Sequence, residues 1–365
     1  MTIVALGNIC EFVYGKALPK SKREEGRFPV YGSNGVVGTH TEALSGSETI
    51  VIGRKGSIGE LNYSPTPCWP IDTTYFVDRN STREDMRWLF YALHALRLPE
   101  LNKATGVPGL NRNDAYERKI FLPSRDEQRR IAAILDKADI IRRRREQVLT
   151  LADDFLWSVF LGMFGDPSAN PMGHSVKNFE TILLIPLRNG ISPSSKGKIS
   201  ANVLTLTAIT GTRFDADQVK EGKFLEPIAA KDAVNRSDFY ICRGNGSPDL
   251  IGKGYFADRD IAGTAFPDTM IAAKPDPHKV TQAYLERLWN SPFVRNQIRE
   301  AARTTNGTFK INQTAAGAIR IPVPPLVDQR KYQEIVDKVG RSVSKLGYGN
   351  DLFPSLSQRA FRGEI

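Results

Sequence analysis

Cysteine is scarce in this chain. The 365 residues contain three cysteines, Cys10, Cys68 and Cys242, an odd number spread far apart in the sequence. This spacing argues against a disulfide framework and predicts reduced, buried thiols in a cytoplasmic protein. The first residues lack a basic segment followed by an apolar run, so no signal peptide is expected. No window of about 18 uninterrupted apolar residues occurs, so no membrane-spanning helix is expected either.

Catalytic and metal-binding motifs are also missing. The four histidines stand alone, without the spacing that binds zinc, so no metal site is expected. The chain has no G-x-S-x-G elbow and no G-x-G-x-x-G after a predicted strand. The segment 246–254, GSPDLIGKG, fails as a phosphate loop because Lys253 is followed by glycine rather than serine or threonine. The sequence therefore predicts a binding protein with no catalytic residues of its own.

The charge balance is moderately basic. Fifty lysines and arginines against 40 acidic residues give a net charge of +10 and a pI near 9.4. An excess of basic residues suits a polyanionic partner, but a lysine-rich solvated surface gives the same balance. Both interpretations stay open at the level of composition.

A long internal repeat is the most informative feature. Residues 109–139, GLNRNDAYERKIFLPSRDEQRRIAAILDKAD, match residues 310–340 without a gap at nine of 31 positions. The identical pairs include Asn111 with Asn312 and Gln128 with Gln329. A spacing near 200 residues is far too long for a solenoid and indicates two copies of a whole domain followed by a helix.

Short β-branched runs between glycine and proline turns dominate residues 1–122 and 175–323. Strands are expected at 49–52 and 239–242, each leading into a glycine-rich turn, and helices at 86–96 and 281–302. The predicted fold class is α+β, with two similar domains. The expected boundaries are 1–124 and 166–325 for these domains, and 125–165 and 326–365 for two long helices.

Apolar residues on the first of these helices follow a heptad seam that includes Ile131, Ala138, Ile141, Val148 and Phe155. The second helix repeats the phase more weakly. Its glycines and Pro354 predict an interruption near 347–354. Two apolar seams in one chain most simply pack against each other, which predicts an antiparallel coiled coil between the two domains and a pseudo-twofold internal repeat.

Four segments in this order resemble the specificity subunit of type I restriction–modification enzymes: RFPVYGSNGVVG at 27–38, TIVIGRKGSIGELNY with CWPIDTTYFV at 49–77, residues 106–139, and SLSQRAFRGEI at 355–365. The resemblance implies two target-recognition domains, each reading one half of a split double-stranded DNA sequence. The helices between them would act as a ruler for the spacer.

The same resemblance implies partners: two methyltransferase (modification) subunits, which use S-adenosylmethionine, and restriction (motor–nuclease) subunits, which use ATP and Mg²⁺. The chain itself would need no cofactor and would catalyse nothing.

Base edges and phosphates are contacted mainly by Arg, Lys, Asn, Gln and Ser side chains on exposed loops. In the first domain these candidates are Ser33, Asn34, Arg54, Lys55, Ser57, Lys103, Thr105, Asn111 and Arg112. In the second they are Lys198, Arg213, Arg243, Asn245, Ser247, Asn306, Lys310 and Asn312. The same residue types also make ordinary turns for backbone reasons alone.

Two other function classes remain open at this stage. One is a stand-alone DNA-processing enzyme such as a nuclease, against which the missing motifs argue. The other is an interaction scaffold without DNA reading, against which the basic loops argue.

Overall fold

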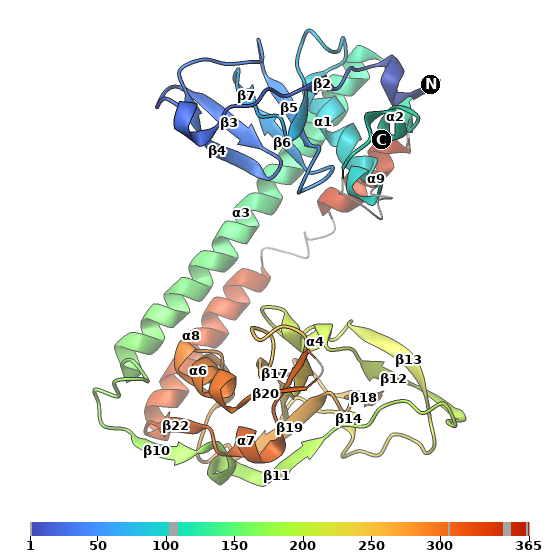
Figure 1. The fold of residues 1–365 in the computed structure, drawn as a ribbon. Coiled ribbons are helices and arrows are strands. Elements are labelled where there is room, and N and C mark those ends of the chain that lie inside the picture. The colour runs from blue at the N-terminus through green and yellow to red at the C-terminus, as the bar shows by residue number, and fades with distance from the viewer. Residues whose placement is uncertain (1, 102–108, 306, 346–351, 363, 365) are drawn as a thin grey trace. The chain divides into compact units, whose positions relative to one another are not determined.

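The computed structural model describes residues 2–101, 109–305, 307–345, 352–362 and 364 (Figure 1). The chain divides into two compact units. Unit 1 comprises 1–147 together with 346–365, and unit 2 comprises 148–345. The α+β class is confirmed. The four domain boundaries expected from the sequence stay a prediction.

Unit 1 contains two small sheets and one strand pair. Its four-stranded sheet has the order β2-β8-β5-β6, its three-stranded sheet the order β4-β3-β7, and β1 pairs with β9. The strands are β1 Thr2–Ala5, β2 Val13–Tyr14, β3 Phe28–Gly32, β4 Gly35–His40, β5 Thr49–Gly53, β6 Leu61–Ser64, β7 Trp69–Pro70, β8 Thr74–Val77 and β9 Lys119–Leu122.

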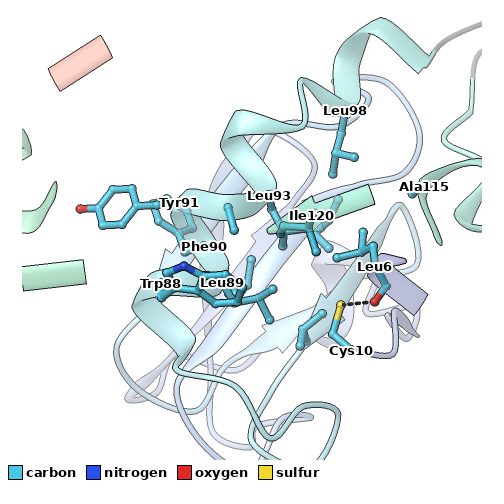
Figure 2. Packing of buried hydrophobic residues seen from close by; sticks show 14 of the residues in the cluster. Leu6, Cys10, Trp88, Leu89, Phe90, Tyr91, Leu93, Leu98, Ala115 and Ile120 are labelled. Atoms are coloured by element: carbon cyan, nitrogen blue, oxygen red, sulfur yellow. Dashed lines mark hydrogen bonds between the residues drawn. The ribbon is translucent and has the colours of Figure 1, made fainter. Parts of the chain in front are cut away.

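The α-helices of unit 1 are α1 Met86–Ala95, α2 Arg112–Tyr116, the first part of α3 Arg125–Phe164, and α9 Leu352–Phe361. Short 3-10 turns are η1 Leu6–Asn8, η2 Lys20–Lys22 and η3 Leu98–Leu101. Helix α1 supplies much of the core, with Trp88, Leu89 and Leu93 fully buried near Leu6 and Ile120 (Figure 2).

Unit 2 repeats this plan with an additional three-stranded sheet in its described part. Its sheets have the orders β11-β19-β15-β17, β13-β12-β18-β14 and β16-β21-β20, and β10 pairs with β22. The strands are β10 Ser175–Asn178, β11 Leu183–Asn189, β12 Ile199–Leu204, β13 Val219–Phe224, β14 Ala233–Val234, β15 Phe239–Cys242, β16 Gly244–Asn245, β17 Gly254–Phe256, β18 Ile261–Ala265, β19 Met270–Pro275, β20 Arg303–Thr305, β21 Thr308–Lys310 and β22 Arg320–Val323.

The helices of unit 2 are α4 Thr207–Thr210, α5 Gln282–Trp289, α6 Pro292–Ala301, α7 Gln313–Gly317 and α8 Leu326–Ser344, with a 3-10 turn, η4, at Phe179–Ile182. The pairing of β10 with β22 corresponds to that of β1 with β9, so each unit's first and last strands lie side by side. The hairpin β3–β4 with parallel β7 corresponds to β12–β13 with parallel β18.

The prediction of a single helix at 281–302 is wrong. Two helices occupy this range, because α5 ends at Trp289 and α6 begins at Pro292 with Ser291 as its N-cap. Proline favours the first helical position, where its missing N–H forms no intrahelical bond. The sequence Ser291-Pro292 is therefore a helix start inside an otherwise amphipathic pattern.

Pro354 was expected to interrupt the second long helix. It lies instead in the first turn of α9, where the backbone N–H groups have no helical acceptor and proline is tolerated. The interruption was predicted near 347–354. The described residues form two helices on either side, with α8 ending at Ser344 and α9 beginning at Leu352, and residues 346–351 lie outside the described ranges.

The long helix predicted from Arg125 is present as α3, but its seam is only partly buried. Ile131 and Ala138 are buried, whereas Ile141 and Phe155 are 53% and 52% exposed. In unit 2 the end of α3 meets the beginning of α8. There Tyr332 packs against Phe160 and Phe164 and donates a hydrogen bond to the Leu156 carbonyl. The predicted coiled coil is not confirmed.

Helix α3 is also the one described helix that is long and apolar enough, on average, to cross a membrane. The sequence expectation excluded such a helix because it required an uninterrupted apolar run. In the structure Phe160 and Phe164 belong to the core of unit 2, and Asp153 forms a 2.8 Å ion pair with Arg287. These contacts bury Phe160 and Phe164 within unit 2, whereas Val148, Leu149 and Leu151 earlier in the helix are exposed.

The repeated glutamine has the same structural role in both units. Gln128 and Gln329 are 1% and 0% exposed. The Oε1 atom of Gln128 accepts from the Asp85 amide at 2.9 Å, and that of Gln329 from the Thr281 amide at 2.9 Å. Each Nε2 atom donates back to the carbonyl of the proline five residues earlier. Each glutamine therefore ties the N-cap of α1 or α5 to the start of α3 or α8.

We predict that Gln128→Leu destabilises unit 1 and Gln329→Leu destabilises unit 2. Each change leaves a buried amide and carbonyl unpaired, at a cost of about 1–3 kcal/mol per group. Urea unfolding measures the loss, with hydrogen exchange assigning it to a unit. The exposed Gln147→Leu is the control and should change little. Equal effects from all three variants would contradict the structural role.

Glu286 on α5 holds the edge strand β17 through its Oε2 atom, which accepts from the Phe256 amide at 2.9 Å. Burial raises the pKa of its carboxyl from 4.5 to about 7. The folded state therefore binds this proton more tightly than the unfolded chain does. The stability that protonated Glu286 contributes is fully present below the pKa of this group in the unfolded chain. This contribution is lost as the pH rises through its folded-state pKa of about 7.

We predict that unit 2 is less stable at about pH 8 than at about pH 5, and that Glu286→Gln reduces this difference. The amide oxygen of glutamine still accepts from Phe256, but it carries no charge. Urea midpoints at both pH values give the measurement, and the exposed Glu300→Gln serves as the control. An unchanged pH dependence in Glu286→Gln would disprove the assignment.

Candidate nucleic-acid interface

A backbone frame around Arg54 organises the predicted loops of unit 1. The Arg54 amide donates to the Thr73 carbonyl at 2.9 Å, and the Arg54 carbonyl accepts from the Leu110 amide at 2.9 Å. The Nη1 atom of Arg54 donates to the Asp72 carbonyl at 3.3 Å. These bonds join the loop after β5, the turn before β8 and the segment before α2.

The same three bonds occur around Arg243 in unit 2. Its amide donates to the Thr269 carbonyl at 2.9 Å, and its carbonyl accepts from the Ile311 amide at 2.9 Å. The Nη1 atom of Arg243 donates to the Asp268 carbonyl at 3.0 Å. Arg54 and Arg243 are therefore equivalent positions, although the residues around them share little sequence.

The repeated asparagines begin equivalent short helices. The Asn111 side chain accepts from the Asn113 amide at the start of α2, and that of Asn312 accepts from the Ala315 amide at the start of α7. Asparagine is a favoured N-cap because its side-chain oxygen satisfies an amide with no helical acceptor. Arg112 and Gln313 occupy the first helical position of the two helices.

The structure gathers several predicted residues in each unit. In unit 1, Lys55 forms a β-bridge with Gly109, next to the frame that joins Arg54 to the loop bearing Asn111 and Arg112. In unit 2, β16 pairs with β21. This places Asn245 opposite Phe309 and Gly244 opposite Lys310, with Asn312 two residues beyond Lys310.

Other predicted side chains are engaged within the protein. Ser33 is 9% exposed, and its hydroxyl donates to the Thr73 carbonyl at 2.8 Å. The Asn245 side chain accepts from the Ser247 amide, and the Ser247 hydroxyl accepts from the Asp249 amide. These interactions shape the loops. A DNA contact by any of these residues stays a prediction.

The remaining predicted residues are more scattered. Asn34 is exposed in the turn between β3 and β4, and Ser57 lies in the tight turn after β5. Lys198, before β12, and Arg213, after α4, are exposed, and no described contact joins them to Arg243. Lys103, Thr105 and Asn306 lie outside the described residues.

The gathered loops carry positive side chains that form no close ion pair among the described residues. Within the described ranges no acidic side chain lies at ion-pair distance from Arg54, Lys55, Arg112, Arg243 or Lys310. In the same ranges no group of three His, Cys, Asp or Glu side chains is placed to hold a metal ion. The arrangement favours binding an anionic surface.

Sequence reasoning missed three residues near these loops. The Tyr14 ring lies beneath both Arg54 and Arg112. The Lys253 Nζ atom donates to the carbonyls of Thr210 and Gly211, and burial lowers the pKa of its ammonium group. Arg295 on α6 donates to the Asp249 carbonyl and thereby supports the loop after β16. Only spatial contacts reveal these roles.

The fold defines a protein with two α+β units. Each unit carries basic residues on loops that are joined by backbone hydrogen bonds. The fold is similar to that of a solved structure, the type I restriction–modification system S subunit from M. genitalium. The two align with a TM-score of 0.63 at 16% identity, over 99% of this chain and 96% of that one.

Residues 1–151 match the family model described as the type I restriction modification DNA specificity domain. The chain is 26% identical over 269 residues to the type I restriction enzyme EcoKI specificity subunit of Escherichia coli (strain K12), covering 67% of this chain and 57% of that protein. It is 25% identical over 270 residues to the StySPI specificity subunit of Salmonella potsdam, with the same coverages. The chain thus matches little more than half the length of these curated relatives.

The chain is therefore similar to the type I specificity subunits, and the match to the DNA specificity domain covers residues 1–151. The resemblance predicted from the four sequence segments is confirmed.

We predict that Asn111→Ala and Asn312→Ala each lower the free energy of unfolding by about 1 kcal/mol through loss of the N-cap. Asn111→Asp and Asn312→Asp should keep that stability, because aspartate caps equally well. The added negative charge should nevertheless weaken binding to duplex DNA. Urea unfolding and fluorescence anisotropy separate the two effects. Undiminished DNA binding by both aspartate variants would argue against an interface at α2 and α7.

Proposed function

We propose that this chain is the DNA-recognition subunit of a type I restriction–modification complex. Each unit reads one half of a split double-stranded target, and the chain positions the modification and restriction subunits on that DNA. The observation that carries this proposal is that Arg54 and Arg243 are each surrounded by the same set of three hydrogen bonds, one set in each unit. Two similar basic frames in one chain suit a target with two halves.

The long helices are the proposed spacer element. We propose that α3 packs with α8 and α9 as an antiparallel coiled coil that sets the distance between half-sites. The meeting of the end of α3 with the beginning of α8 supports this arrangement, because antiparallel pairing requires that contact. Ile141 and Phe155 are exposed seam residues, and this packing would cover their apolar surface.

Chemistry belongs to the partners in this proposal. The two modification subunits use S-adenosylmethionine, and the restriction subunits use ATP and Mg²⁺. The present chain holds no cofactor and works in the cytoplasm. The match of residues 1–151 to a DNA specificity domain supports a recognition role over a stand-alone nuclease or a scaffold.

We predict that Arg54→Ala and Arg243→Ala each weaken DNA binding by about 1–3 kcal/mol, and that their effects add. Hydroxyl-radical footprints of the full chain assembled with its modification subunits should lose protection over one half of the target in Arg54→Ala. Protection over the other half should be lost in Arg243→Ala. Arg97→Ala, outside both frames, is the control.

Several results would contradict the proposal. A footprint that loses the same half in both variants would exclude two recognition units. Cleavage of DNA by the purified chain with divalent metals would support the nuclease alternative. Salt-insensitive or absent DNA binding, with and without modification subunits, would favour the alternative of an interaction scaffold without DNA reading.

A further inference from the structure

Unit 1 contains a pair of guanidinium groups on one aromatic ring. The Cζ atom of Arg54 lies 5.0 Å from the centroid of the Tyr14 ring, and that of Arg112 lies 5.2 Å from the same centroid. The Tyr75 ring packs against Tyr14, with a distance of 5.0 Å between the two ring centroids. Tyr14 is 49% exposed, so the cluster lies at the surface.

Two like charges held on one ring repel each other, and a bound anion would relieve that repulsion. Attraction to the electron-rich face of Tyr14 offsets part of the repulsion. The part of the chain that the structure describes places no carboxylate at ion-pair distance from either arginine. Arg54 uses its Nη1 atom on the Asp72 carbonyl. Its other donors, and those of Arg112, have no described protein acceptor.

The described residues of unit 2 form no such cluster, although they keep the frame. Tyr14 pairs with Tyr75 across β2 and β8, and Asn189 pairs with Ile271 at the matching place in β11 and β19. The glycine that follows each residue donates to the partner strand in both units. Asn189 therefore stands where Tyr14 stands in unit 1, and Gln313 stands where Arg112 stands.

We propose that Tyr14, Arg54 and Arg112 form a phosphodiester clamp that grips the DNA backbone in unit 1 alone, with Tyr14 as a positioning residue for the two cations. The clamp rests on the proposed function, because its ligand is the DNA of the target. Paired guanidinium groups suit phosphate oxygens, which accept several hydrogen bonds and carry a full negative charge. A phosphate contact fixes register and orientation without reading sequence.

The test is the salt dependence of DNA binding by the full chain assembled with its modification subunits. Loss of one phosphate contact lowers the slope of log affinity against log salt by about one and weakens all sequences alike. Arg112→Gln, which copies unit 2, should show both effects. Tyr14→Leu should do the same, whereas Tyr14→Phe keeps the ring and should match the wild type. Arg97→Gln removes a charge elsewhere on unit 1 and should leave the slope unchanged.

A gain-of-function variant makes the test independent of folding losses. Asn189→Tyr combined with Gln313→Arg rebuilds the cluster around Arg243 and should steepen the slope by about one. Gln313→Arg without the tyrosine is its matched control and should give a smaller change.

The outcomes separate the clamp from the proposed function. If the wild type binds DNA and Arg112→Gln keeps the full slope, the clamp is wrong and the function stands. If Arg112→Gln instead relaxes the preference at one base pair without changing the slope, Arg112 reads a base and the clamp is also wrong. If the wild type shows no salt-dependent binding, both proposals fail.

Discussion

One backbone hydrogen bond joins the loops that are gathered at the candidate interface in each unit. The carbonyl of Arg54 accepts the Leu110 amide, and the carbonyl of Arg243 accepts the Ile311 amide. This bond joins two loops that are more than 50 residues apart in sequence, and the arginine side chain adds a second tie to the turn before the next strand. Because the bond uses main-chain atoms, side chains beside it can change without loss of the frame. The frame therefore allows two units with different surface chemistry on one architecture.

That property also explains what the sequence could predict. The match between residues 109–139 and 310–340 revealed the duplication, since Asn111, Gln128 and their partners serve buried or capping roles that only a few residue types fill. The equivalence of Arg54 and Arg243 was not visible, because it depends on carbonyl and amide groups that every residue carries. Tyr14 gave no signal either, since its importance comes from two arginines that are distant in sequence and close only after folding. Ser291-Pro292 was visible as a helix start, but the amphipathic pattern across it dominated the prediction.

The two units divide their tasks differently around the same frame. In unit 1 an aromatic ring and a second arginine surround Arg54. In unit 2 the equivalent places hold Asn189 and Gln313, whose amides donate and accept hydrogen bonds without charge. A second arginine therefore stands beside the frame in unit 1 alone, while the buried glutamines Gln128 and Gln329 and the closing strand pairs are alike in both units. These internal contacts are thus shared by both units, whereas the side chains beside the frame differ.

Helix α9 has a consequence for how the chain comes into being. Its residues Phe353 and Phe361 pack against Tyr91 and Trp88 of α1, so the core of unit 1 includes residues made after all of unit 2. Synthesis at about 5–20 residues per second separates Gln147 from Phe361 by roughly 10–40 s. During that interval Trp88 and Tyr91 lack their α9 partners. Unit 2 is contiguous in sequence, so all of its residues are available before α9 is made. The unit that begins first is therefore completed last, because its core needs residues that follow all of unit 2.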